Sequence, residues 1–353
     1  MAHEPKTLQQ AIIYFSNPDN CVAYLVARRW PNGVVCPTCG STEVSFVASR
    51  RVWQCKTRHP KCQFSVKVGT IFEDSPIGLD KWLAAMWMIA NCKNGISSYE
   101  IGRNLKVTQK SAWFMLHRIR LALQDKNLGS KLGGHGKEVE ADETFIGGKA
   151  RNMHKDVKAR RIAGQGQAAK DKIIVMGVLE RGGKVRTQII PDRQKETLQP
   201  LVRRHVELGS ALFTDEMGGY KGLSEYEHEI IDHAVRYANG RVHTNGMENF
   251  WSLLKRGLGG TYISVEPFHL FRYLDEQAFR YNNRATKDNP RNDADRFDMA
   301  VSQVVGKRLT FAEVTGKVGE TVSQILEPEA REARLRRFDF GPGRCGFFAA
   351  ALR

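Results

Sequence analysis

The chain has 353 residues, with 54 Lys or Arg against 38 Asp or Glu, so its formal net charge is +16 at pH 7. This length allows two or three domains with a sizeable core, and a hydrophobic share of 41% with a charged share of 26% is that of an ordinary globular protein. Such a basic balance favours a polyanionic partner, most often nucleic acid.

A membrane surface is the rival partner for a basic protein. However, no run of about 18 apolar residues is present to span a bilayer, and the start MAHEPKTLQQ lacks a signal-peptide core. We therefore expect an intracellular protein without membrane association. In that compartment the seven cysteines are not expected to form disulfides, and metal binding becomes the first alternative.

The first elements in chain order are two short amphipathic helices within residues 7–30, broken at Asn17-Pro18. A cysteine cluster follows. Cys36 and Cys39 form one knuckle, and Cys55, His59 and Cys62 form a second, less regular group. Structural zinc needs four N or S ligands in a tetrahedron, and a small β segment with little core gains stability from it.

The spacing leaves the fourth zinc ligand open between Cys62 and His59, and we favour Cys62. The alternative to a zinc site is a β hairpin with reduced thiols. The other three cysteines, Cys21, Cys92 and Cys345, have no partner at ligand spacing.

Residues 80–124 are helical by periodicity and contain a candidate helix-turn-helix. Ser97 or Ser98 can cap its first helix and Thr108 its second. In this motif the start of the second helix enters the major groove. The expected DNA-contacting residues are Gln109, Lys110 and Ser111, with Arg118 and Arg120 as phosphate contacts. A plain helical hairpin is the alternative.

A Gly- and Lys-rich segment precedes a region that becomes strand-rich from residue 138. We expect a first strand through EVEAD, a hairpin of two apolar strands joined by RGG, a helix at KETLQPLVRRHVELG and a fourth strand at ALFTD. Residues 243–260 and 268–284 are predicted to be helical.

Three acidic residues occur in an informative order along this region. Asp142 follows the first strand pattern, Asp215 closes the fourth, and Glu248 lies in the later helix. Glu143 could replace Asp142. Carboxylates that converge repel one another unless a cation lies among them, and two Mg²⁺ ions held by carboxylates promote in-line displacement at phosphodiesters. Acidic residues on a first strand, on a fourth strand and on a later helix, in this order, are typical of the ribonuclease H-like arrangement.

The helix that contains Glu248 is rich in possible DNA contacts: His243, Asn245, Lys255 and Arg256. Lys255 lies seven positions after Glu248, on the same helical face. His243 could contact DNA, orient a carboxylate or be structural, whereas Phe250 and Trp251 are expected to pack in the core.

Over roughly residues 15–290 the chain resembles the zinc-ribbon DDE transposases of bacterial insertion sequences. The resemblance rests on the motifs CPTCGS, QFSVKVGTIFEDSPI, ADETFIGGK, FTDEMGGYKGL, HTNGMENFWSLLKRGLGGTY and FRYLDEQAFRYNNR. It implies a catalytic triad of Asp142, Asp215 and Glu248, and a contact of Lys255 with transposon-end DNA. The irregular second knuckle departs from the usual ribbon.

The resemblance also implies a bacterial, nucleoid-associated protein in the cytoplasm. It further implies the cofactors, partners and reaction. These are one structural Zn²⁺, two Mg²⁺ or Mn²⁺ ions, double-stranded DNA at terminal inverted repeats and target sites, and a homo-oligomer on DNA. Water would free a 3′ hydroxyl at the transposon end, and this hydroxyl would attack target DNA. An inactive DNA-binding regulator and a nuclease of the same fold are the alternatives.

The expected fold is multidomain, α+β and α/β. Its parts are N-terminal helices at 1–30, a zinc ribbon at 31–72, a helix-turn-helix region at 78–125, a linker at 126–137, a ribonuclease H-like mixed sheet with flanking helices at 138–287, and a C-terminal region without an assigned role at 288–353.

Overall fold

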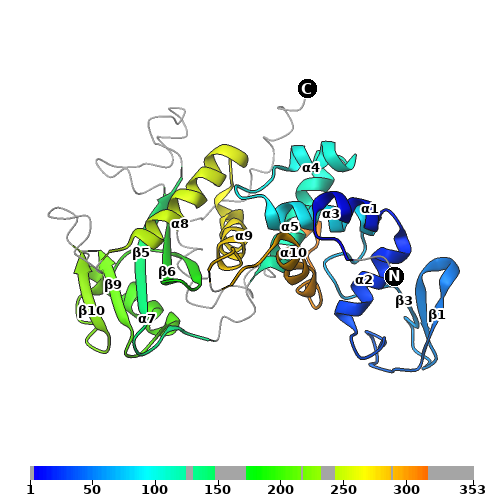
Figure 1. Ribbon diagram of the computed structural model, residues 1–353, viewed down its shortest axis with the longest axis horizontal. Coiled ribbons are helices and arrows are strands. Elements are labelled where there is room, and N and C mark those ends of the chain that lie inside the picture. The colour runs from blue at the N-terminus through cyan, green and yellow to red at the C-terminus, as the bar shows by residue number, and fades with distance from the viewer. Residues whose placement is uncertain are drawn as a thin grey trace.

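The computed structural model (Figure 1) describes residues 4–124, 130–147, 172–215, 218–231, 243–287 and 289–316. A small sheet and a larger sheet lie at opposite ends of the molecule, coloured blue and green in Figure 1, with helices between them. None of the helices in the described ranges is long and apolar enough to cross a membrane.

The chain starts with the two helices expected from the sequence, α1 (Leu8–Phe15) and α2 (Pro18–Arg29). Thr7 caps α1 by accepting from the backbone N–H of Gln10, and Asn17 caps α2 by accepting from that of Asp19. Pro18 stands at the first position of α2, where its missing N–H costs nothing.

The small sheet has three antiparallel strands in the order β1-β2-β3, namely β1 (Val44–Val47), β2 (Val52–Cys55) and β3 (Gln63–Phe64). Trp53 of β2 stacks on Phe64 of β3, and both rings contact Trp30. This aromatic group supplies most of the little core that so short a sheet can bury.

The helical centre of the molecule is built from α3 (Leu79–Asn91), α4 (Ser98–Leu105) and α5 (Gln109–Leu123). Nearly the whole of α3 is buried, and α5 is buried from Met115 onward. A capping box between Ser97 and Glu100 starts α4, and Thr108 caps α5.

The chain returns to this centre after residue 288. Helix α10 (Asp293–Ser302) packs on α3 and α2, and its Phe297 is buried against Trp87. The following residues pair with the ribbon side of the core, through a bridge between Thr70 and Val305. Helix α11 (Phe311–Val314) packs on α5. The described part of the region without an assigned role therefore completes the N-terminal core.

The larger sheet has five strands in the order β10-β9-β5-β6-β7. Their bounds are Glu138–Ile146 for β5, Ile173–Glu180 for β6, Val185–Ile190 for β7, Ala211–Asp215 for β9 and Glu227–Ile231 for β10. β5, β6 and β7 are antiparallel neighbours, while β9 and β10 run parallel to β5. The expected hairpin is confirmed, whereas β10 was not expected.

Helices cover both faces of this sheet, because β6 is apolar on both sides. Ile174, Met176 and Val178 pack in the core that includes α7 (Lys195–His205). Val175 and Leu179 pack on the other face, with α8 (Asn245–Arg256) and α9 (Leu270–Asn282). Helix α9 also packs on α5, so it joins the sheet to the helical centre.

A short parallel pair extends the sheet domain. β4 (Leu132–Gly133) pairs with β8 (Val206–Glu207). Leu132 is buried in the core beside α7, so residues that the sequence assigned to a linker pack here on the sheet domain.

Candidate functional site

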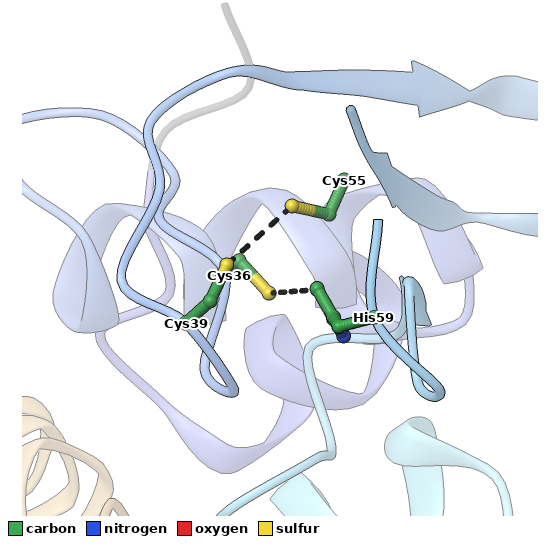
Figure 2. Close-up of side chains that lie close together, drawn as sticks. All are labelled: Cys36, Cys39, Cys55 and His59. Atoms are coloured by element: carbon green, nitrogen blue, oxygen red, sulfur yellow. Dashed lines mark hydrogen bonds between the residues drawn. The ribbon is translucent and has the colours of Figure 1, made fainter. Parts of the chain in front are cut away.

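Four side chains of the ribbon converge on one point, as Figure 2 shows. Cys36 and Cys39 come from the turn before β1, Cys55 ends β2, and His59 lies in the loop before β3. Their ligand atoms all lie within 4.8 Å of one another. The structure therefore groups His59, and not the expected Cys62, with the three cysteines.

The position of Cys62 explains this correction. Its backbone carbonyl accepts from the N–H of Cys55 at 2.7 Å, and its half-buried side chain packs against the aromatic core. His59, in contrast, brings its Nε2 atom to 3.4 Å from the Cys36 sulfur.

The distances suit a tetrahedral zinc ion. Zinc bonds of about 2.3 Å to sulfur and about 2.0–2.1 Å to nitrogen imply S···S edges of about 3.8 Å and S···N edges of about 3.6 Å. The Cys39 and Cys55 sulfurs are 3.7 Å apart, and the Cys36 sulfur is 3.4 Å from His59 Nε2. The donor set thus fits a structural Zn²⁺.

The knuckle also favours a thiolate at Cys36. Burial alone would raise the pKa of this thiol, but hydrogen bonds from the backbone of Cys39 and Thr38 and contacts with the Cys39 and Cys55 sulfurs lower that pKa to about 6. Zinc binds thiolates, so the lowered pKa favours metal binding by Cys36 near neutral pH.

The three candidate catalytic carboxylates come together beside the C-terminal end of β9, next to the middle of β5. Asp142 is on β5 and Asp215 ends β9; the two strands are parallel and pair Ala141 with Thr214, so the aspartates follow at equivalent positions. Glu248 stands in the first turn of α8, which packs on β5. Within the described ranges, only the ribbon brings three such ligand atoms within 4.8 Å, so the carboxylates are neighbours in a more open arrangement.

Strand alternation separates Asp142 from Glu143. The carboxylate of Asp142 accepts from Trp251 Nε1 at 2.9 Å, which places it on the α8 face. Glu143 accepts from the buried Tyr220 hydroxyl, and Tyr220 belongs to the core on the α7 face. Asp142 therefore faces the helix that carries Glu248, and Glu143 does not.

Electrostatics link the same carboxylates. Burial, then the charge of Asp215 and more weakly that of Glu248, raise the pKa of Asp142 to about 6, against hydrogen bonds from Glu143 and Trp251 that lower it. Burial and the charge of Asp142 raise the pKa of Glu143 to about 8. Such mutual repulsion is what a bound cation would relieve.

A buried polar network, which sequence reasoning missed, fixes the start of α8. Thr244 at the N-cap makes no side-chain hydrogen bond with the described residues. Instead the fully buried Glu140 accepts from the backbone N–H of Met247 at 2.9 Å and from Arg181 Nε at 2.7 Å. Arg181 also donates to the carbonyl of His243. The signal was present as EVEAD, since Glu140 shares a strand face with Asp142.

The candidate DNA contacts on α8 lie at its two ends. Asn245 is exposed at the start, and Lys255 and Arg256 are exposed in the last turn. His243 is half-buried, with Nδ1 3.5 Å from Glu140, so in this fold it faces the network that anchors the helix.

The candidate contacts of α5 occupy its first turn. Lys110 is exposed, whereas Gln109 donates to the Ser98 hydroxyl at 2.9 Å and Ser111 is bound to the Thr108 cap. Lys106 takes a left-handed conformation, with φ of 50°, in the turn between α4 and α5.

Arg118 differs from the expected phosphate contact. It is only 5% exposed, and its guanidinium donates to three backbone carbonyls, those of Ile71, Glu73 and Leu309. Arg120 is likewise buried and pairs with Glu276 at 2.6 Å. Because α5 is covered beyond its first turns, both cations hold packed segments together and are not available to DNA.

Comparison with known proteins adds independent evidence. The ISXO2-like transposase domain matches residues 131–282, and the transposase zinc-ribbon domain matches residues 16–63. An uncharacterized protein in transposable element ISH50 of Halobacterium salinarum is 30% identical over 252 residues, which are 67% of this chain and 82% of that protein. An uncharacterized transposase-like protein of Haemophilus influenzae is 35% identical over 106 residues, 30% of this chain and 85% of that protein.

Proposed function

Because the chain belongs to the family of zinc-ribbon transposases with an ISXO2-like catalytic domain, we propose that it binds the ends of its element and catalyses strand cleavage and strand transfer with Mg²⁺. One observation carries the proposal. Asp142, Asp215 and Glu248 come together from three separate elements, and burial together with the charges of the other two raises the pKa of Asp142.

The strand order supports a ribonuclease H-like catalytic domain. Three antiparallel strands are followed by a helix and by two strands parallel to the first, and the first strand lies at the centre of the sheet. This order places the end of β9 beside the middle of β5, so that carboxylates on both strands face a later helix.

The three carboxylates would hold the Mg²⁺ ions, since carboxylate oxygens are the ligands that Mg²⁺ prefers. When bound, the ions stabilise charge on the attacking and leaving oxygens of an in-line displacement. The chain supplies the positioning. Trp251 orients Asp142, and Lys255 and Arg256 would contact the phosphate backbone. Water attacks the phosphodiester at the element's end and displaces its 3′ oxygen, which leaves as a free 3′ hydroxyl. This hydroxyl then attacks a phosphodiester of the target strand and displaces the 3′ oxygen there.

DNA recognition is assigned to α4, α5 and the ribbon. The close approach of the two helices supports a helix-turn-helix, since a Cβ on Gly102 would lie 3.2 Å from the carbonyl oxygen of Val107. Lys110 at the exposed start of α5 would reach the groove, with Gln109 and Ser111 beside it. We expect a homo-oligomer on double-stranded DNA.

The proposal is tested with purified full-length protein and linear DNA that carries the terminal inverted repeats of its element. We expect Mg²⁺-dependent nicks at the repeat ends and joined products in added target DNA. Binding without nicking would favour the inactive regulator, and nicking without joining would favour the nuclease.

A further inference from the structure

An exposed apolar side chain follows the basic end of α8. After Lys255 and Arg256 the chain makes a π-helical turn (Gly257–Thr261) and then reaches Ile263. Ile263 is 82% exposed, more than any other large hydrophobic residue in the described part of the chain. Isolated exposed apolar residues are common, so exposure alone does not assign a role.

The backbone at Ile263 is strained as well. Its φ is 61°, a left-handed value that is a genuine outlier for a β-branched residue. The N–H of Ser264 bonds to the carbonyl of Tyr262 at 2.6 Å, which closes a tight three-residue turn of the rare, strained type. Strain of this kind persists where the surroundings enforce it, and it clusters at functional positions.

Buried charged side chains hold this turn in its conformation. The Tyr262 hydroxyl donates to Glu276, which is fully buried and also pairs with Arg120 of α5 and with Arg280. A Cβ on Gly95, in the loop before α4, would collide with the Tyr262 hydroxyl. Ile263 is therefore presented from a rigid base between α8 and the α4–α5 pair.

We propose that Ile263 is an apolar wedge that inserts between base steps of transposon-end DNA, an inference that rests on the transposase function proposed above. The exposed cations at the end of α8 suit a phosphate backbone. Proteins that kink DNA insert side chains such as Ile between base steps and partly unstack them. A wedge here would distort the duplex between the helix pair that binds the end and the helix that carries Glu248.

The test uses full-length protein and end duplexes with 2-aminopurine placed at successive positions near the cleavage junction, without Mg²⁺. Wild type should raise the fluorescence at one step, and Ile263→Ala should not. Ile13→Ala is the matched control, because Ile13 is also an apolar residue that is 66% exposed, on α1. With Mg²⁺, Ile263→Ala should cleave intact ends roughly tenfold more slowly, the loss expected for one buried apolar contact.

A mismatch at the responsive step should restore most of the cleavage by Ile263→Ala, because the unstacking is then already made. Ile263→Gly, which suits a positive φ, should melt no lower than wild type and show the same fluorescence loss. Equal cleavage by Ile263→Ala and wild type, or a defect that the mismatch does not rescue, would overturn the wedge. A change of oligomeric state with unchanged fluorescence would overturn it in favour of a contact between copies. Failure of wild type itself to cleave the ends would refute the transposase proposal instead.

Discussion

Asp142 carries both the proposed chemistry and a cost in stability. The pKa of its carboxyl is about 6 in the folded chain, above the ordinary value of 3.8. The folded state therefore binds this proton more tightly than the unfolded state, and ionisation of Asp142 works against folding as the pH rises from about 4 to 6.

Asp142→Asn should thus stabilise the metal-free protein near pH 7. We expect a gain of about 1–2 kcal/mol in the free energy of unfolding, which disappears near pH 3.5, where the wild-type carboxyl is protonated as well. Urea unfolding at both pH values, with a chelator present, measures this. A loss of stability at pH 7 would show that favourable partners of the carboxylate outweigh its burial and its repulsion from Asp215.

A second prediction at single residues concerns the fourth zinc ligand, for which His59 and Cys62 are the candidates. His59→Ala should lose most of the bound zinc, because the ring supplies the fourth ligand, whereas Cys62→Ser should keep about one zinc per chain. Metal analysis of the freshly purified variants decides between them. Zinc retained by His59→Ala and lost by Cys62→Ser would restore the assignment that the sequence spacing favoured.

Among the elements, α8 depends on close contact with the sheet. Gly177 of β6 lies opposite Asp142, and a Cβ there would lie 2.2 Å from the Met247 methyl group and 2.7 Å from the Trp251 ring, both on α8. Gly177→Ala should therefore push Trp251 away from Asp142, cost about 1–3 kcal/mol of stability and slow Mg²⁺-dependent cleavage.

Gly218→Ala is the control for this prediction, since Gly218 has no neighbour within 4 Å of an added Cβ. Thermal unfolding and cleavage rates of the two variants are compared. If Gly177→Ala unfolded and cleaved DNA like wild type, close packing of α8 on β6 would not be required.

The sequence predicted the elements that have strong local signals, but it did not predict contacts between distant segments. Periodicity, caps and the RGG turn were enough for α1, α2, α5 and the hairpin of β6 and β7. Strand β10 is short and lies at the sheet edge, with a polar start at Glu227 that gave no clear alternation. The EVEAD pattern places Glu140 on the same face as Asp142, but it does not show that Glu140 anchors α8, because Glu140 and Met247 are 107 positions apart.

In the functional site, too, local sequence patterns were informative, whereas contacts that depend on the fold could not be predicted. The order of Asp142, Asp215 and Glu248 along the chain was informative, because two neighbouring parallel strands and the start of a helix bring them together. The spacing of Cys55, His59 and Cys62 could not identify the fourth zinc ligand, since the loop conformation decides it. Burial of Arg118 depends on Leu309, 191 positions later, so its charge alone suggested an exposed contact.

The described C-terminal residues stabilise the N-terminal half of the molecule, for which we propose DNA binding. Phe297 of α10 is 1% exposed among aromatic residues of the N-terminal core, and Lys307 donates to the last carbonyls of α5. Phe297→Ala should therefore cost about 3–5 kcal/mol and weaken end binding.

Met299→Ala is a useful comparison, because Met299 is only partly buried on the same helix and should cost less. Chemical denaturation and end-binding titrations measure both variants. If Phe297→Ala left stability unchanged, α10 would be a dispensable addition to the core.

The central claim is that one part of the molecule holds DNA while the carboxylates on the sheet and α8 perform the chemistry. The most direct measurement is Mg²⁺-dependent cleavage and joining of repeat-end DNA by Glu248→Gln, beside its affinity for the same end. Glutamine keeps the size of the side chain and removes the charge that a divalent metal needs. We predict that both reactions are lost while end binding stays within about threefold of wild type, roughly 0.6 kcal/mol. Full strand transfer by Glu248→Gln would contradict the account.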